Sequence, residues 1–301
     1  MPPLVAAAQL CSSSSPALNG QRAAALIRRA AARHACVVFF PEAADYIAAN
    51  AVHSLSLVQP VTTSPFVLAI QETLAALHSE GTHIDVVAGV HEPTEQPQLD
   101  KRTRNTLLYF NSTGEIVQRY QKIHLFDVDI PHGPILKESN SVQPGNAITT
   151  PFDTPLGKLG MAICYDLRFP ELALELRRQG AQILTYPSAW TMKTGPHFQT
   201  LAKAMAILTQ CYVIMPAQKG VHNTSHGLPD GIDITTTRES YGHTCIIDPN
   251  GTILAECPDT YSGEAAEEGS LCFAEVDLTV VERMRINMPL WQHRRPDVFN
   301  K

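Results

Sequence analysis

Residues 158–171 read KLGMAICYDLRFPE, a stretch that joins the end of a strand to a sharp turn and the start of a helix. The apolar run 158–163 predicts a buried strand, and the amphipathic pattern of 171–179 predicts a helix. Cys164 lies between them, where the apolar run ends and charged residues begin. A helix amino end carries partial positive charge, so we expect it to help Cys164 to ionise. From this stretch alone, a nucleophile and a buried core cysteine are equally good interpretations of Cys164.

Outside this stretch, short β-rich runs alternate with amphipathic runs along the whole chain. The predicted strands are 5–10, 37–40, 83–90, 104–110, 116–122, 158–163, 183–186, 212–216, 242–247, 253–256 and 271–276. The predicted helices are 20–34, 64–79, 171–179 and 198–210. Such alternation favours layered sheets covered by helices. Because no linker rich in Gly, Ser or Pro and no internal repeat divides the chain, we expect residues 1–301 to form a single domain.

The composition narrows the class of protein. The 301 residues carry a net charge of −6, which offers no basic surface for nucleic acid or anionic lipid. No run of about 20 apolar residues predicts a membrane span, and the amino end lacks the basic region of a signal peptide. The seven cysteines form an odd set without tight pairs, which indicates a reducing compartment. We expect a cytoplasmic protein, with a mitochondrial form left open.

Two more chemically active residues follow predicted strands. Glu42 comes directly after the apolar run 37–40, where desolvation would raise its pKa toward the range useful for proton transfer. A capping or salt-bridged glutamate is the alternative. Lys122 ends a predicted hairpin strand among apolar neighbours. Because ligand sites in α/β folds collect at the carboxyl ends of strands, we expect Glu42, Lys122 and Cys164 to converge.

Three segments together carry a resemblance to a known family. They are FPEAAD (40–45), RYQKIHLFDVD (119–129) and CYDLRFPE (164–171). In motif, order and spacing they resemble the signatures of the nitrilase superfamily of carbon–nitrogen hydrolases, over nearly the whole chain. Three further segments are similar to the Nit branch of that superfamily: PSAW (187–190), RESYGH (238–243) and MPLWQHRRPD (288–297).

The resemblance implies a fold and a catalytic set. The fold is an α/β four-layer αββα sandwich that forms a homodimer or a higher homo-oligomer. The catalytic residues are Glu42, Lys122 and Cys164, with Glu138 matching a second family glutamate that orients Lys122 or the attacking water. The backbone N–H of Tyr165 and Lys122 would face the developing oxyanion. No metal and no cofactor is expected.

Candidate residues for substrate binding are less strongly indicated. Arg168, Lys193 and Arg238 could each hold a substrate carboxylate. A structural salt bridge from Arg168 to Glu171 or Asp166 is an equally good interpretation. Trp190 would line the pocket, with a core position as the alternative.

Other features are interpreted structurally or mark departures from the family pattern. His222 and His226 stand four apart, but without a third ligand we do not expect a metal site. The Met and Leu residues of 201–215 predict helix and strand core. Met205, Leu208 and Thr209 replace residues that the family often carries, which puts the subunit contact of that helix in doubt. Long surface excursions are expected at 222–239 and 259–269.

These observations predict a thiol-dependent amidase that hydrolyses a small carboxylated amide through a thioester on Cys164. The substrate that the resemblance favours is deaminated glutathione, which would give 2-oxoglutarate and Cys-Gly. The alternative is ω-amidase activity on α-ketoglutaramate or α-ketosuccinamate. A binding or signalling protein on the same fold and a papain-like peptidase are remoter interpretations, because the catalytic set is intact and no local Cys/His signature is present.

Overall fold

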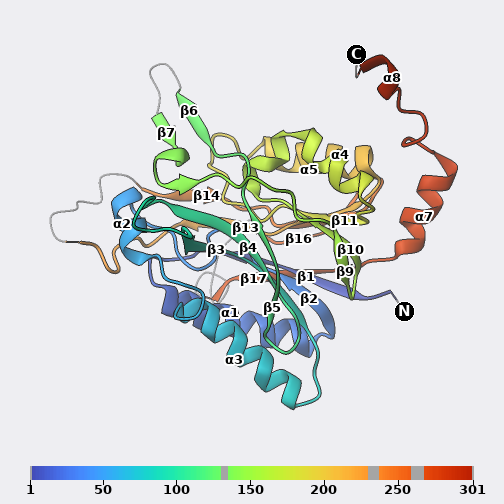
Figure 1. Cartoon of the computed structure of the whole chain (residues 1–301). Coiled ribbons are helices and arrows are strands. Elements are labelled where there is room, and N and C mark those ends of the chain that lie inside the picture. Colours follow the sequence, from blue (N-terminus) through green and yellow to red (C-terminus); the bar gives the residue numbers. More distant parts are fainter. Residues whose placement is uncertain (1, 130–134, 230–236, 259–267, 300–301) are drawn as a thin grey trace.

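A computed structural model describes residues 2–129, 135–229, 237–258 and 268–299 (Figure 1). The helices are α1 (Pro16–Ala32), α2 (Ala51–Leu57), α3 (Pro65–Ser79), η1 (Glu138–Asn140), η2 (Cys164–Arg168), α4 (Pro170–Arg178), α5 (His197–Thr209), α7 (Leu278–Asn287) and α8 (Pro296–Phe299). The strands up to residue 121 are β1 (Leu4–Leu10), β2 (Ala35–Phe39), β3 (Asp85–Pro93), β4 (Thr103–Phe110) and β5 (Ile116–Gln121). The later strands are β6 (Asp127–Asp129), β7 (Ile135–Lys137), β8 (Val142–Gln143), β9 (Phe152–Thr154), β10 (Gly157–Met161), β11 (Ile183–Thr185), β12 (Tyr212–Met215), β13 (Ala217–Val221), β14 (Glu239–Tyr241), β15 (Cys245–Ile247), β16 (Ile253–Glu256) and β17 (Ser270–Glu275).

Two large sheets form the centre of the molecule. Within the described residues, the first sheet runs β14-β13-β1-β2-β3-β4-β5, with β17 also paired to β1 and β8 to β4. The second sheet runs β16-β15-β12-β11-β10-β9. Neighbouring strands β1, β2 and β3 are parallel, as are β10, β11 and β12. The carboxyl ends of each parallel set therefore meet at one edge of its sheet.

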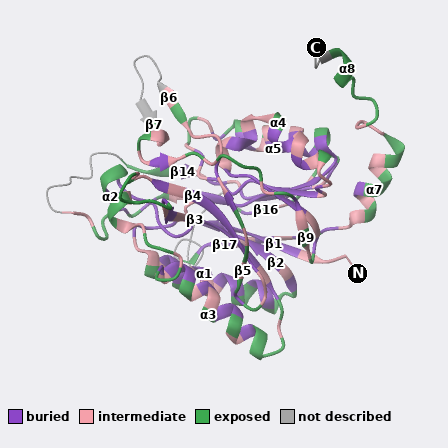
Figure 2. Ribbon diagram, viewed as in Figure 1, coloured by how far each residue is buried: buried purple, intermediate pink, exposed green. Residues whose placement is uncertain are grey.

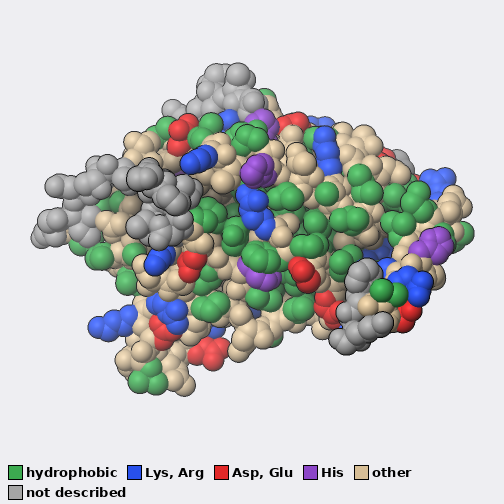
Figure 3. Space-filling model, turned by 90° about the horizontal axis from the view of Figure 1, so that it is seen from above, with side chains coloured by type: hydrophobic (Ala, Val, Ile, Leu, Met, Phe, Trp, Pro, Cys, Tyr) green, Lys and Arg blue, Asp and Glu red, His purple; other side chains and the backbone are tan. Residues whose placement is uncertain are grey.

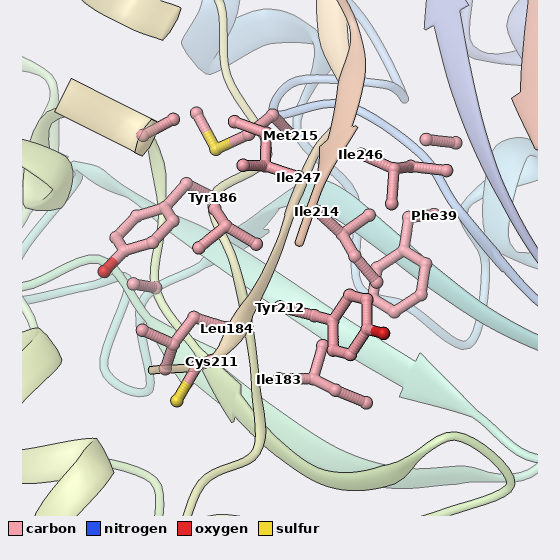
Figure 4. Close-up of a cluster of buried hydrophobic side chains, with 14 of the residues drawn as sticks. Phe39, Ile183, Leu184, Tyr186, Cys211, Tyr212, Ile214, Met215, Ile246 and Ile247 are labelled. Atoms are coloured by element: carbon pink, nitrogen blue, oxygen red, sulfur yellow. The ribbon is translucent and has the colours of Figure 1, made fainter. Parts of the chain in front are cut away.

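The sheets lie between two helix layers. Helices α1 and α3 cover the outer face of the first sheet, and α4 and α5 cover the second (Figure 1). Buried residues fill both the space between the sheets and the space beneath the helices (Figure 2). Figure 4 shows Phe39 of the first sheet in one cluster with Ile183, Ile214 and Ile246 of the second. The predicted αββα architecture is confirmed.

The sequence pattern located most of the elements. The predicted helix 64–79 corresponds to α3, and the predicted hairpin corresponds to β4 and β5. Elements such as α2 and β14 were missed, because their short sequences AVHSLSL and ESY contain no continuous apolar run. The expected excursions at 222–239 and 259–269 fall partly on 230–236 and 259–267, which lie outside the described residues.

One prediction about the core is wrong. Leu208 was expected in the core, but it is 52% exposed on α5, whereas Met205 and Met215 are buried. The buried stripe of α5 runs through Phe198, Ala202, Met205, Ala206 and Thr209, and Leu208 lies to one side of it. Of the helices described, none has the length and apolar character that crossing a membrane requires.

Candidate active site

Cys164 lies on a sharp turn that follows strand β10. It is the first residue of η2, and its φ of 48° belongs to the left-handed region that non-glycine residues seldom occupy. Its backbone N–H donates to the carbonyl oxygen of Pro187 at 3.0 Å, which ties the turn to the segment after β11. Cys164 as a whole residue is partly exposed, whereas Glu42 and Lys122 are buried. The turn therefore presents the sulfur at the edge of the second sheet.

Asp166 fixes this turn to the rest of the site. Its Oδ2 accepts from the Tyr120 hydroxyl at 2.6 Å and from the backbone N–H of Ile163 at 2.9 Å. Its Oδ1 accepts from the backbone N–H and the Nδ1 of His124, at 3.1 and 2.7 Å. Tyr120 and His124 flank Lys122 in the sequence, so one buried carboxylate connects the Cys164 turn to the Lys122 segment.

A second turn, after β2, positions Glu42. The backbone of Glu42 passes directly over Gly89 of β3, where a Cβ would lie 2.6 Å from the Glu42 Cα. The N–H of Ala44 donates to the carbonyl oxygen of Gly89 at 2.8 Å, and Ala43 takes a φ of 53°. Only glycine permits this approach, so Gly89 sets the depth at which the Glu42 side chain enters the site.

The Glu42 carboxylate contacts four groups. Its Oε1 accepts from Lys122 Nζ at 2.9 Å and from Asn105 Nδ2 at 2.7 Å. Its Oε2 accepts from the backbone N–H of Ala189 at 3.0 Å. The Cys164 thiol acts on this carboxylate as well, since their side-chain interaction lowers the pKa of Glu42 and raises that of Cys164. Glu42 therefore occupies the position of a proton acceptor for the thiol.

Lys122 lies between two glutamates. Besides its contact with Glu42, its Nζ donates to Glu138 Oε2 at 2.9 Å and to Glu138 Oε1 at 3.0 Å. Glu138 is held in turn by the backbone N–H of Phe126, at 2.7 Å from its Oε2. The formal charge of Glu42, Glu138 and Lys122 together is −1. The structure thus brings Glu42, Lys122, Glu138 and Cys164 together.

The electrostatics of the site correct two expectations. Burial would raise the pKa of Glu42, but Lys122 and hydrogen bonds from Cys164 and Asn105 outweigh it, so the pKa is lowered, not raised as expected. Burial and the negative charge of Glu42 hold the pKa of Cys164 well above its usual value, although Lys122 opposes them. Burial would lower the pKa of Lys122, but Glu138 and Glu42 raise it well above its usual value.

The expected help from a helix terminus is not present either. Helix α4 begins at Pro170, six residues after Cys164, because the chain first makes the η2 turn. The partial positive charge of a helix fades within its first turn, so α4 does not act on the sulfur. The resting thiol is therefore protonated, and its activation falls to Glu42.

Aromatic side chains lie next to the Cys164 turn. The Tyr165 ring packs edge-on against Phe126 and Phe169, at centroid distances of 5.1 and 5.3 Å. Its backbone N–H has no acceptor in the part of the chain that the structure describes. Trp190 is buried, and its indole N–H likewise lacks a partner among the described residues.

Arg168 stacks on this group and forms no salt bridge. Its guanidinium carbon lies 4.7 Å from the Trp190 ring centroid, and its Nη2 lies 3.2 Å from His197 Nδ1. The alternative of an ion pair with Glu171 or Asp166 is wrong within the described structure, since Asp166 is fully engaged with Tyr120, His124 and Ile163. Arg168 thus keeps its charge unpaired beside the Cys164 turn.

The other expected carboxylate-binding residues differ in position. Burial lowers the pKa of Arg238, while the charges of Glu138 and Glu42 act in the opposite direction, so Arg238 lies within electrostatic reach of both. As a residue Arg238 is exposed to solvent. Lys193 is exposed and makes no contact with Glu42, Lys122 or Cys164 in the described structure.

His222 has a structural environment. Its Nδ1 lies 2.8 Å from the Ser12 carbonyl oxygen and its Nε2 lies 2.8 Å from Ser240 Oγ. Burial lowers its pKa to about 4. Both ring nitrogens are occupied, and His226 contributes its backbone carbonyl to His53 and Ser14. Neither histidine faces the other as a ligand pair.

Sequence reasoning missed three contributors to the site: Asn105, Asp166 and the backbone N–H of Ala189. Asn105 is buried in the polar first half of β4, which reads TRNT over 103–106, so its polar character did not distinguish it from its neighbours in the sequence. Asp166 was considered only as a partner of Arg168. A backbone N–H leaves no mark in the sequence, so the role of Ala189 was not detectable.

Two cavities of the molecule lie away from Cys164. A cavity of about 600 Å³ is lined by residues such as Pro3, Leu156 and Leu278, and another of about 240 Å³ by residues such as Glu92 and Arg119. Neither is lined by Cys164.

Comparison with known proteins agrees with this geometry. A family model described as carbon-nitrogen hydrolase matches residues 4–286. The chain belongs to the carbon–nitrogen hydrolase family. The predicted resemblance to the nitrilase superfamily is thereby confirmed, and with it an enzyme that acts on carbon–nitrogen bonds of amides.

Most of the individual relatives compared with this hydrolase span nearly the full chain. It is 44% identical to "Probable hydrolase nit2" of Schizosaccharomyces pombe, over 98% of both chains, and 40% identical to "Deaminated glutathione amidase" of Mus musculus, over 99% of this chain and 84% of the relative. It is 40% identical to "Omega-amidase NIT3" of Saccharomyces cerevisiae, over 68% of this chain and 64% of the relative. The crystal structure of the C. elegans NitFhit protein superimposes with a TM-score of 0.84 at 34% identity, over 99% of this chain and 67% of that one.

Proposed function

We propose that this hydrolase cleaves a small carboxylated amide through a thioester on Cys164, with deaminated glutathione as the substrate. The observation that carries the chemistry is the Glu42 carboxylate, which lies 2.9 Å from Lys122 Nζ and interacts with the Cys164 thiol strongly enough to shift the pKa of both groups. The choice of substrate is supported by relatives that are named deaminated glutathione amidase and are 39–40% identical over 99% of this chain.

In the first half of the reaction Glu42 accepts the thiol proton as the sulfur attacks the amide carbonyl. Lys122 stabilises the thiolate, which offsets the raised pKa of Cys164. The carbonyl oxygen becomes an oxyanion that Lys122 Nζ and the backbone N–H of Tyr165 can stabilise. One such donor typically lowers the activation free energy by about 3–4 kcal/mol. Protonated Glu42 then donates its proton to the departing amine. Its lowered pKa makes it an effective acid for that step.

In the second half water attacks the thioester, and Glu42 again accepts a proton. Glu138 holds Lys122 in place through two contacts of 2.9 and 3.0 Å, so its proposed role is to orient Lys122. The thiol of Cys164 recovers its proton from Glu42, and the carboxylic acid product leaves. No proton or electron is gained or lost by the enzyme over the cycle.

For the substrate side we propose Arg168, Arg238 and Trp190 as contacts, together with the backbone of Tyr165. Arg168 lies beside the Cys164 turn, and Arg238 lies within electrostatic reach of Glu42. Neither guanidinium forms an ion pair with a described residue, so each can bind a substrate carboxylate. The indole N–H of Trp190 is buried without a partner in the described structure, and a bound substrate oxygen would satisfy it. Lys193 stays a candidate only for the outer rim, because it is exposed.

The alternative is ω-amidase activity on the shorter α-ketoglutaramate. It is supported by the 40% identity to the relative named omega-amidase. The two substrates share an acyl part and differ in the leaving group, so kcat/KM on each separates the functions. A preference of about tenfold or more for deaminated glutathione supports our proposal. A strict preference for α-ketoglutaramate overturns it in favour of the alternative.

We also propose a single domain that acts in the cytoplasm as a homodimer or a higher homo-oligomer. The oligomer is supported by hydrophobic side chains that gather over the outer helix layer (Figure 3). Ile207 and Leu208 of α5, one of the helices that cover the second sheet, are 43% and 52% exposed. Replacing Leu208 with glutamate should shift the sedimentation coefficient toward that of a monomer.

A further inference from the structure

His91 lies beside the catalytic side chains, although no step proposed above uses it. It belongs to β3, where it stands directly opposite Asn105 of the antiparallel strand β4. Residues directly opposite in such a pair project to the same face with Cβ atoms about 5 Å apart. Asn105 donates to Glu42 at 2.7 Å and to Glu138 at 3.4 Å. His91 therefore shares the face of the sheet that carries both glutamates.

The pattern along β3 gives the same result. Gly89, two residues before His91, lies directly under the backbone of Glu42. Val87, two residues earlier still, belongs to the core between the two sheets. Because side chains alternate along a strand, these three residues face the same side. His91 continues that row beyond Glu42, at the carboxyl end of the strand.

The imidazole is held in one orientation. Asp45 Oδ2 accepts from the backbone N–H of His91 at 2.8 Å, and Asp45 Oδ1 accepts from its Nδ1 at 2.9 Å. The Tyr46 ring stacks on the imidazole with a centroid distance of 4.2 Å and an interplanar angle of 20°. Because a carboxylate only accepts hydrogen bonds, the proton lies on Nδ1. Nε2, on the far side of the ring from Asp45, has no partner among the described residues.

The charge of the ring fits an anionic ligand. Burial would lower the pKa of His91, but Asp45, Glu42 and Glu138 outweigh it and the pKa is raised. The cationic form carries a proton on Nε2 as well as on Nδ1. The net formal charge of −1 on Glu42, Glu138 and Lys122 repels a carboxylated substrate, so binding needs positive charge from other residues.

We propose that His91, oriented by Asp45, is a specificity-determining residue whose Nε2–H hydrogen-bonds to the anionic end of the substrate. This inference rests on the proposed function, because it takes the substrate to be a carboxylated amide. Asp45 and Tyr46 are positioning residues in it. The orientation by Asp45 matters as much as the charge, since a ring free to rotate would lose Nε2 as a directed donor.

Two isosteric variants separate this role from a structural one. His91→Asn keeps an amide nitrogen where Nδ1 was and loses the donor at Nε2. His91→Gln keeps a donor near Nε2 and loses the one that faces Asp45. We would measure kcat/KM for each on α-ketoglutaramate and on butyramide, which is similar in length but has no carboxylate, and record thermal melting of both.

We expect His91→Asn to lose about 10- to 100-fold in kcat/KM on α-ketoglutaramate, mainly through KM, as for loss of a charge-assisted hydrogen bond. Its kcat/KM on butyramide should change less than about threefold. His91→Gln should retain more of the activity on α-ketoglutaramate than His91→Asn does. Equal losses on the two substrates, a larger loss in His91→Gln than in His91→Asn, or no loss in either overturns the inference.

A binding measurement makes the result independent of turnover. Calorimetry would compare 2-oxoglutarate binding to Cys164→Ala with binding to Cys164→Ala/His91→Asn. We expect the second Kd to be about 10- to 100-fold weaker. If the wild type hydrolyses no carboxylated amide and this difference is still seen, the proposed reaction fails and the role of His91 stands. If turnover is as proposed and the two Kd values agree, the role of His91 fails alone.

Discussion

Replacing Asp166 with asparagine should destabilise the protein and disturb the site without altering a proposed catalytic residue. Asp166 is fully buried and accepts four hydrogen bonds, two at each oxygen. In Asp166→Asn one oxygen becomes an NH₂ group, which then faces two donors. A hydrogen bond to a charged group contributes about 1.5–3 kcal/mol, so the loss of two predicts about 3–6 kcal/mol of destabilisation. At about 2 °C per kcal/mol for a large domain, the melting temperature should fall by about 6–12 °C.

The assay is thermal unfolding at neutral pH by differential scanning calorimetry, with kcat/KM measured at a temperature where both proteins are folded. Activity should fall as well, because Asp166 connects the Cys164 turn to the segment that carries Lys122. The matched control is Asp153→Asn, since Asp153 is 85% exposed and its ion pair with Lys158 spans 3.3 Å. That pair should contribute less than about 1 kcal/mol. A melting temperature for Asp166→Asn within about 2 °C of the wild type would refute the reasoning.

Three further predictions concern the residues around Glu42. Asn105→Ala removes a 2.7 Å hydrogen bond that lowers the pKa of Glu42, so the pKa of Glu42 should rise. Because Glu42 acts in its ionised form, the acid limb of the pH profile of kcat/KM should move to higher pH. An acid limb at the wild-type pH would contradict this prediction. Gly89→Ala places a Cβ 2.6 Å from the Glu42 Cα. We expect the free energy of unfolding, measured with denaturant, to fall by about 1–3 kcal/mol and kcat to fall as well. Wild-type values of both would exclude the proposed close approach. Lys122→Met leaves the buried Glu42 and the nearby Glu138 without their cation. We therefore expect the free energy of unfolding to fall by about 3–5 kcal/mol and turnover to become unmeasurable. A stable, active variant would show that Lys122 is dispensable.

The positions of the main catalytic candidates were predictable because each follows an apolar strand. Runs such as 37–40 and 158–163 are long enough to indicate strands, and Glu42 and Cys164 stand just beyond them. Parallel strands then bring their carboxyl ends to one edge. The αββα architecture depended on the motif resemblance, since alternation of strands and helices indicates layers but does not count them.

The electrostatics were not predictable, because they depend on partners distant in the sequence. Burial of Glu42 was foreseeable, but its pKa is lowered by Lys122 and Asn105, which are 80 and 63 residues away in the sequence. Helix α4 begins at Pro170, one residue before the predicted start at 171, because proline suits the first turn of a helix, and residues 164–168 before it form the η2 turn. Local sequence patterns indicate where a helix begins, but they do not show which distant residues contact Glu42.

The central claim is that Cys164 carries the acyl group during turnover, with Glu42 as its proton acceptor. Intact-protein and peptide mass spectrometry on acid-quenched steady-state turnover of deaminated glutathione tests it most directly. We predict one adduct with the mass of the 2-oxoglutaryl group on the peptide that contains Cys164, and neither adduct nor hydrolysis in Cys164→Ala. Hydrolysis at the wild-type rate by Cys164→Ala, or an adduct confined to another residue, would contradict the claim.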